Sequence, residues 1–219
     1  MTLAVSALVV AKAPVPGLAK TRLAASIGDD AAARIAAAAL LDTLDAVAAA
    51  PLHRKVVALT GDLRAAICGH EIRSRLADFT VVAQRGADFA ERLANAHADA
   101  SAGLPVLQIG MDTPQVASDM LTECAQTLLG ADAVLGLAED GGWWVLGVSE
   151  PSMADCLRTV PMSQHDTGAL TLAALCANGI DVRLVAGLAD VDTVDDIAAV
   201  RATCAADSRF VRVTRAVGV

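Results

Sequence analysis

Short runs of aliphatic residues recur along the chain, and stretches long enough for helices separate them. These runs are Leu3–Ala11, Lys55–Thr60, Thr80–Ala83, Pro105–Gly110 and Ala133–Leu137. They are largely apolar throughout rather than alternating, which is typical of strands that are covered on both faces. Their regular exchange with helical stretches predicts parallel βαβ units in a three-layer α/β/α fold.

The longest predicted helix runs from Asp29 to Ala50. Its two leading aspartates suit the positive end of a helix dipole, and Pro51 cannot continue the helix. Apolar residues recur at helical spacing along it, namely Ile35, Leu41, Leu44 and Val47.

The pattern changes after Leu137. The apolar segment Trp143–Val148 follows the preceding run after only a short AEDGG turn, which is too short for a helical crossover. An antiparallel strand is therefore predicted there, within a sheet that is otherwise mostly parallel. A last strand is expected at Val182–Val185.

The C-terminal part continues with the acidic segment ADVDTVDD. Thr193 can cap a helix that runs to about Ala205, and a moderately basic tail begins at Asp207. No repeat, low-complexity linker or change of composition divides the sequence. Residues 1–219 are therefore expected to form a single domain.

Charge and cysteine usage limit the classes of function. The formal net charge of -8 argues against sequence-independent nucleic-acid binding, which needs a dense cationic surface. The five cysteines include no CxxC pair, so they predict neither a disulfide framework nor a zinc cluster and suit the cytoplasm. The segment from Thr2 to Ala11 lacks the basic leader of a signal peptide, and no membrane span is expected.

A basic loop follows the first predicted strand and reads KAPVPGLAKTR. Lys12, Lys20 and Arg22 could hold a polyphosphate, while Pro14 stiffens the loop and Gly17 permits a close approach of the backbone. The alternative is a solvated basic turn. The loop is no P-loop, because that motif requires glycine where Ala19 precedes the lysine.

Two further loops carry carboxylates at positions where strands end or helices begin. Asp112 in IGMDTP directly follows a predicted strand, and Asp190 and Asp192 stand two residues apart. Like charges 4 Å apart repel by about 4 kcal/mol at an intermediate dielectric of about 20, so convergence would require a cation such as Mg²⁺ or Mn²⁺. The alternatives are a turn role for Asp112 and a helix-dipole role for the other two.

The segment AEDGGWW brings an acid and two glycines next to the only two tryptophans. Asp140 is a candidate general base, with an ordinary turn role as the alternative. Gly141 and Gly142 would let a ligand approach the backbone. In a strand Trp143 and its neighbour face opposite sides, so one belongs to the core and the other could line an acceptor pocket.

Among the four histidines, His165 in MSQHDTG is the candidate for contact with substrate, because it alone lies in a loop near the predicted site. His53, His70 and His97 are expected at the surface or in packing.

Taken together, these loops resemble the nucleotide-diphospho-sugar transferase superfamily of GT-A fold. The closest resemblance is to bacterial glycosyltransferase-like proteins that share KAPVPGxxKTRL. The matching segments occur in order along nearly the whole chain, as AKAPVPGLAKTRLA, FAERLANA, IGMDTP, AEDGGWWVLG and DVDTVDDI. KTRL and DVDTVDDI also look like the guanylyltransferases that act on phospholactate or phosphoenolpyruvate.

The resemblance implies a nucleotide or nucleotide-sugar donor and a small-molecule acceptor. By it, Asp112, Asp190 and Asp192 would bind the metal, while Lys20 and Arg22 would contact phosphate. The remaining nucleotide-binding candidates are Lys12, Pro14, Gly17 and, within FAERLANA, Arg92. The acceptor pocket would comprise Gly141, Gly142, Trp143 and His165.

Two departures from the pattern of these relatives occur beside Asp112. Gly110 stands where an Asp-x-Asp pair would have its first acid, and Met111 replaces a small hydroxyl residue. Three functions follow from the sequence: glycosyl transfer, nucleotidyl transfer with release of pyrophosphate, and a degenerate module that only binds or assembles. The sequence is also compatible with a homo-oligomer.

Overall fold

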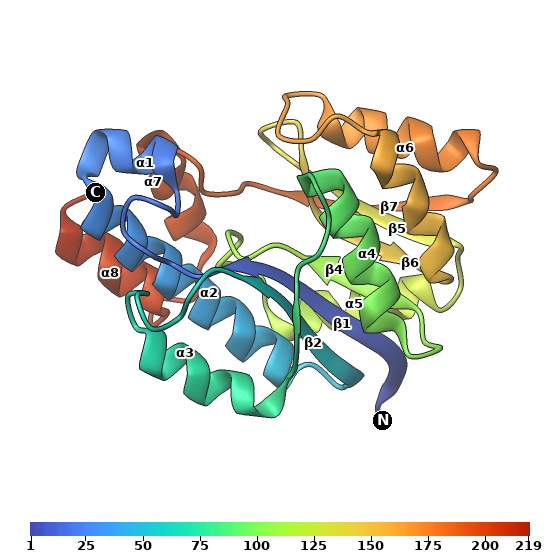
Figure 1. Cartoon of the computed structure of the whole chain (residues 1–219), viewed down its shortest axis with the longest axis horizontal. Coiled ribbons are helices and arrows are strands. Elements are labelled where there is room, and N and C mark those ends of the chain that lie inside the picture. Colours follow the sequence, from blue (N-terminus) through green and yellow to red (C-terminus); the bar gives the residue numbers. More distant parts are fainter.

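The computed structural model describes residues 1–219, and its seven strands form one sheet in the order β3-β2-β1-β4-β6-β5-β7 (Figure 1). The strands are β1 Leu3–Lys12, β2 Leu52–Thr60, β3 Thr80–Ala83, β4 Val106–Ile109, β5 Ala133–Ala138, β6 Trp143–Val148 and β7 Val182–Leu188. Only β6 is antiparallel to its neighbours, β4 and β5. This confirms the mixed, mostly parallel sheet expected from the sequence.

Ten helical segments connect or follow the strands. The α-helices are α1 Thr21–Ile27, α2 Asp29–Ala49, α3 Gly69–Arg75, α4 Phe89–Ser101, α5 Ser118–Leu128, α6 Thr167–Ala177, α7 Val194–Thr203 and α8 Arg209–Val217, and the 3-10 helices are η1 Leu76–Asp78 and η2 Pro151–Thr159. No helix combines the length and the apolar character that a membrane crossing requires.

The helices cover both faces of the sheet and thus form three layers (Figure 1). Side chains of β1 alternate between two cores, with Val9 in the core beneath α2, α3 and α5 and Leu8 in the core beneath α4, η2 and α6. A third, smaller core joins α1, α2, α7 and α8 around Phe210. These contacts fix α1 and α7 beside the end of β1.

Several boundaries differ from the expectations. The second strand begins at Leu52 because its backbone continues to pair with Leu3, although His53 is exposed. The last strand extends to Leu188, where it still pairs with β5 at the edge of the sheet. The helix capped by Thr193 ends at Thr203 rather than near residue 205.

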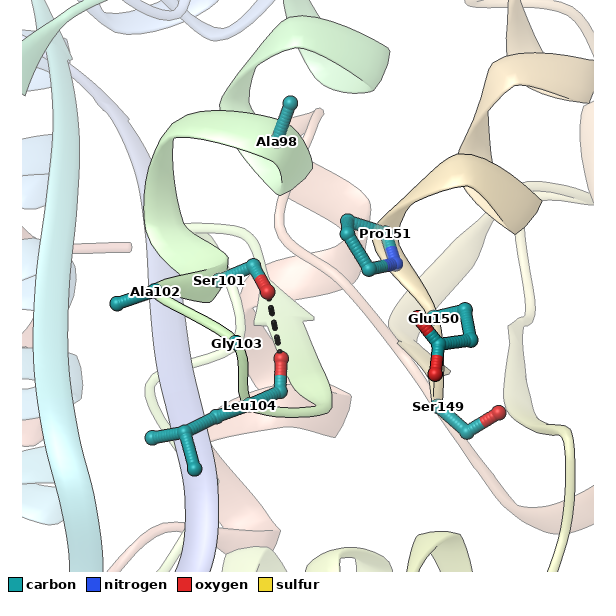
Figure 2. Close-up of a pocket in the computed structure, with 8 residues that line it drawn as sticks. All are labelled: Ala98, Ser101, Ala102, Gly103, Leu104, Ser149, Glu150 and Pro151. Carbon is teal, nitrogen blue, oxygen red and sulfur yellow. Dashed lines mark hydrogen bonds between the residues drawn. The ribbon is translucent and has the colours of Figure 1, made fainter.

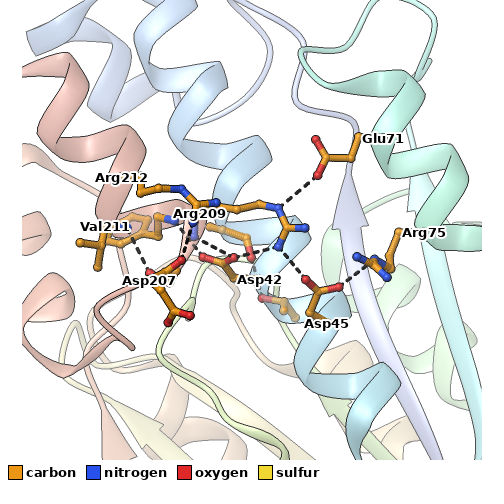
Figure 3. A network of polar contacts seen from close by, with 12 residues as sticks. Asp42, Asp45, Glu71, Arg75, Asp207, Arg209, Val211 and Arg212 are labelled. Atoms are coloured by element: carbon orange, nitrogen blue, oxygen red, sulfur yellow. Dashed lines mark hydrogen bonds and ion pairs between the residues drawn. The ribbon is translucent and has the colours of Figure 1, made fainter.

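Two helices, α1 and α8, form where the sequence predicts a basic loop and a basic tail. The residues Thr21 and Arg22 begin α1 rather than closing a loop, and Leu23 of this short helix is fully buried in the third core. The basic tail folds into α8, where Ser208 caps the helix and Phe210 is completely buried. Arg209 binds the carboxylates of α2 and α3 that Figure 3 shows.

Candidate active site

Lys20 lies at the centre of the candidate site. Its Nζ is 2.8 Å from Asp112 Oδ2 and 3.9 Å from Asp192 Oδ1, and its side chain is only 14% exposed. Burial alone would lower the pKa of Lys20, but the carboxylates of Asp112, Asp192 and Asp190 together outweigh burial and raise that pKa, with Asp112 contributing most. The ammonium group is therefore held charged between acids from two distant segments.

Asp112 reaches this position because β4 ends at Ile109 and the chain turns at once. The backbone amide of Val191 donates to the carbonyl oxygen of Asp112 at 3.2 Å, and the amide side chain of Gln115 donates to the carbonyl oxygen of Ala189. These two hydrogen bonds hold the segment after β7 against the loop after β4. Gln115 carried no signal in the sequence that marked it for this role.

Asp192 is shared by two cations. Arg22 Nη1 lies 2.6 Å from Asp192 Oδ2, although the arginine side chain is 67% exposed. Asp196 fixes the backbone here, since its Oδ2 accepts from the amides of Asp192 at 3.0 Å and Thr193 at 2.6 Å. The resulting capping box starts α7 and sets the position of the acidic loop.

Asp190 adds negative charge to the same region. Burial, together with the carboxylates of Asp140 and Asp112, raises the pKa of Asp190 to about 6, while Lys20 opposes the shift. Asp190 is therefore repelled by carboxylates from two loops, Asp112 after β4 and Asp140 after β5. All three predicted metal ligands thus act on Lys20: Asp112 and Asp192 lie within 3.9 Å of its Nζ, and the charge of Asp190 also raises its pKa.

The donor set suits a hard divalent cation, which prefers carboxylate oxygens. The ammonium group of Lys20 stands between Asp112 and Asp192 as a cation substitute. No group of three histidine, cysteine, aspartate or glutamate side chains is already arranged around a point that could hold a metal ion.

The two departures beside Asp112 have physical counterparts. A Cβ on Gly110 would lie 2.7 Å from Asp112 Oδ1, so the present carboxylate position leaves no room for a side chain there. Met111 contacts the start of the basic loop, because its sulfur accepts from the amide of Lys12 at 3.1 Å.

The turn between β5 and β6 interlocks with the loop before α6. A Cβ on Gly141 would lie 1.7 Å from the carbonyl oxygen of His165, and the amide of Gly168 donates to the carbonyl oxygen of Gly141 at 2.7 Å. Asp140 Oδ1 accepts a hydrogen bond from the amide of Gly142 at 2.7 Å, so one of the two carboxylate oxygens stabilises the turn.

The tryptophan pair divides between the two faces of the sheet. Trp144 is buried in the core beneath α2 and donates its indole N–H to the carbonyl oxygen of Ala186 at 2.9 Å. Trp143 is half-buried and packs against the core on the other face.

The other predicted nucleotide-binding residues do not touch the Lys20 cluster through any hydrogen bond or ion pair. Lys12 and Gly17 are exposed, and Pro14 is buried, with its carbonyl oxygen accepting from the amide of Ile67 at 3.0 Å. Arg92 lies on α4, where its guanidinium carbon is 5.7 Å from the centre of the Phe89 ring.

A cavity of about 460 Å³ adjoins the N-terminus of α4. Its walls include Phe89, Arg158 and Met162, and none of the four predicted acceptor residues lines it. A second cavity, of about 310 Å³, lies at the other end of α4 beside Ser101 and Pro151 (Figure 2). That cavity is beyond the N-terminal end of β4 and therefore away from the carboxyl ends of the parallel strands.

Several solved structures share the overall fold of this chain. A protein of Desulfovibrio desulfuricans G20 whose description proposes a nucleotide-diphospho-sugar transferase has 25% identity and a TM-score of 0.85, over 99% of this chain and 97% of that chain. The shared architecture is the observed mixed sheet with helices on both faces.

Two more distant structures share the fold alone. Rv0371c of Mycobacterium tuberculosis H37Rv, in complex with manganese, has 18% identity and a TM-score of 0.53 over 90% of this chain and 97% of that chain. The 4-diphosphocytidyl-2C-methyl-D-erythritol synthase of Anaerococcus prevotii DSM 20548 has 13% identity and a TM-score of 0.56 over 90% and 96%, respectively. The comparison with curated proteins gave no significant match.

A family model, described as an uncharacterized protein conserved in bacteria (DUF2064), matches residues 43–164. The matched segment contains Asp112 and Asp140, whereas Lys20, Asp190 and Asp192 lie outside it. Since this match spans more than half of the 219 residues, the chain belongs to the DUF2064 family.

Proposed function

We propose that this protein is a metal-dependent transferase that uses a nucleotide-diphospho-sugar as donor. The observation that carries the proposal is the meeting of Lys20 and Arg22 with Asp112 and Asp192. In an open parallel sheet, ligands bind beyond the carboxyl ends of the strands, where this cluster lies. The likeness to the Desulfovibrio protein supports the donor class.

The cations and acids would have separate tasks. Lys20 and Arg22 would bind the diphosphate of the donor and stabilise it as it departs. Asp112, Asp190 and Asp192 would hold Mg²⁺ or Mn²⁺, and the manganese complex of the Mycobacterium tuberculosis protein supports this choice of ions. When bound, such an ion would supply electrostatic stabilisation of the charge that develops on the leaving diphosphate.

The acceptor would enter from the side of β6. Gly141, Gly142, Trp143 and His165 would form the adjoining wall, and the close contact of Gly141 with His165 and Gly168 supports a fixed shape for it. Asp140 would take the proton of the acceptor hydroxyl through the carboxylate oxygen that the turn does not use.

A single assay tests the donor chemistry. The protein is incubated with Mn²⁺ or Mg²⁺, a mixture of sugar nucleotides and nucleoside triphosphates, and a panel of small acceptors, and the released product is identified. A nucleoside diphosphate would support glycosyl transfer. If no nucleotide reacts and none raises the melting temperature, a degenerate binding or assembly module becomes the better account.

Nucleotidyl transfer is the second candidate, because the fold is also that of a cytidylyltransferase-like synthase. In that reaction an acceptor phosphate attacks the α-phosphorus of a nucleoside triphosphate and pyrophosphate leaves. The nucleophile is already anionic, so a strong general base is not needed. Release of pyrophosphate in the same assay would exclude glycosyl transfer.

A further inference from the structure

We propose that Lys20 is the resident cation of the carboxylate cluster, and that its ammonium group must leave Asp112 before a divalent metal can bind there. Resident cation here means a side-chain charge that occupies the ion's place until substrate arrives. This inference rests on the proposed function, because it assigns Lys20 a second role at the same site.

The contacts of Lys20 distinguish it from the neighbouring arginine. Its Nζ lies 2.8 Å from Asp112 and 3.9 Å from Asp192, and its side chain is only 14% exposed. Arg22 pairs only with Oδ2 of Asp192, and its side chain is 67% exposed. Lys20 is thus the cation that sits between the two acidic loops.

The backbone of Lys20 indicates that this position is enforced. The residue caps α1 with φ 49° and ψ 51°, a left-handed conformation that a residue with a side chain adopts at a cost of about 1 kcal/mol or more. Such strain persists only where the surrounding structure requires it. In this conformation the side chain reaches Asp112, 2.8 Å from Nζ.

Charge balance explains the expected competition. Asp112 and Asp192 are each paired with a cation, and Asp190 also lies within the field of Lys20. The two cations offset most of the charge of the three carboxylates, so the cluster attracts a divalent ion less strongly than the carboxylates alone would. Removing the ammonium group would leave carboxylates exposed to one another, and a metal would then relieve their repulsion.

Donor phosphates provide an alternative partner for the ammonium group. Lysine is a compact point charge that readily binds phosphate oxygens. Donor binding would therefore draw Lys20 away from Asp112 and free the acids, so that donor and metal each strengthen the binding of the other. If Lys20 served phosphate alone, its removal would leave metal affinity without nucleotide unchanged.

The test measures Mn²⁺ binding without nucleotide, by titration with electron paramagnetic resonance of the free ion. Lys20→Met and Lys20→Gly remove the ammonium group, and glycine also suits the left-handed backbone should methionine fail to fold. Lys55→Met is the matched control, since Lys55 is partly buried and binds the carbonyl oxygen of Ala48 away from the site.

We expect both Lys20 variants to bind Mn²⁺ at least tenfold more tightly than the wild type, and Lys55→Met to match the wild type. Lys20 variants that are folded by thermal melting but bind Mn²⁺ no more tightly would overturn the inference, even if the wild type turns over nucleotide. A gain of affinity in a protein that uses no nucleotide donor would support the inference and count against the proposed function alone.

Discussion

Arg209, the first residue of α8, donates through Nη1 to Asp42 Oδ1 of α2 at 3.3 Å, across 167 positions of the sequence (Figure 3). The same arginine reaches Asp45 at 2.6 Å and Glu71 at 3.2 Å, and the amide of Phe210 donates to Asp42 at 2.8 Å. This network joins the end of the chain to the helix that covers β1. It therefore supports the small core that also holds α1 and α7.

We expect Arg209→Met to lower the free energy of unfolding by about 1–3 kcal/mol, because Asp42, with a side chain only 10% exposed, loses its cationic partner. Partial exposure keeps the loss below that of a fully buried pair. Urea unfolding measures the effect. Arg215→Met is the control, since Arg215 is exposed on the same helix and makes no ion pair. Equal losses in the two variants would contradict the role of the network.

Replacing Asp112 tests the site directly. Asp112→Asn removes the charge that holds Lys20 while keeping the size of the side chain, and we expect turnover to fall about 100-fold or more. Steady-state assays measure the change, with the donor that the product-identification assay selects. Asp119→Asn, on the exposed start of α5, should retain turnover within about twofold because it only removes a helix-dipole contact. Comparable turnover in Asp112→Asn and the wild type would show that the cluster is not catalytic.

The turn between β5 and β6 can be tested by comparing the stability of alanine variants at Gly141 and Gly179. Gly141→Ala would place a methyl group 1.7 Å from the carbonyl oxygen of His165, in addition to the strain of φ +90°. Gly179→Ala has similar backbone strain at φ +74° but meets no atom within 4 Å.

We expect Gly179→Ala to cost about 1 kcal/mol and Gly141→Ala at least about 2 kcal/mol more, because the backbone must move. Thermal melting compares the two variants. Similar melting temperatures would mean that the two loops separate easily, and the acceptor wall would then have no fixed shape.

His97 makes the stability of the protein depend on pH. It is completely buried on α4, neither ring nitrogen has a hydrogen-bond partner, and burial lowers its pKa to about 4, while Gln108 beside the ring opposes the shift. In the unfolded chain the pKa is about 6.5. Between these values the unfolded state binds more protons, so stability is complete above about pH 6.5 and is lost as the pH falls through about 4.

We expect the wild type to lose about 2 kcal/mol from this group between pH 7 and pH 5, from the unfolded pKa and linkage. Carboxylates contribute their own pH dependence, so His97→Leu serves as the reference. Urea unfolding of both proteins at the two pH values should show a smaller loss in the variant. An identical loss would mean that His97 is not the group that titrates.

The sequence by itself determined the layers of the fold. Continuous aliphatic runs are typical of covered strands, and the predicted segment at Leu3 corresponds to the buried strand β1. The segment Thr80–Ala83 coincides with β3, although this edge strand is largely exposed. The short interval before Trp143 left no length for a helix, so the antiparallel strand could be predicted from chain length alone. Thr193 and Asp196 likewise carry a local capping pattern that does not depend on distant residues.

Only the tertiary structure decided which charges meet. Lys20 and Asp112 are 92 positions apart, and no local pattern states that the lysine enters the acidic cluster instead of facing solvent. The docking of α8 also depends on carboxylates of α2 and α3 that look like ordinary surface residues in the sequence. Local propensity and periodicity specify elements, whereas ion pairs depend on how those elements are packed, and packing becomes definite only when the whole chain has folded.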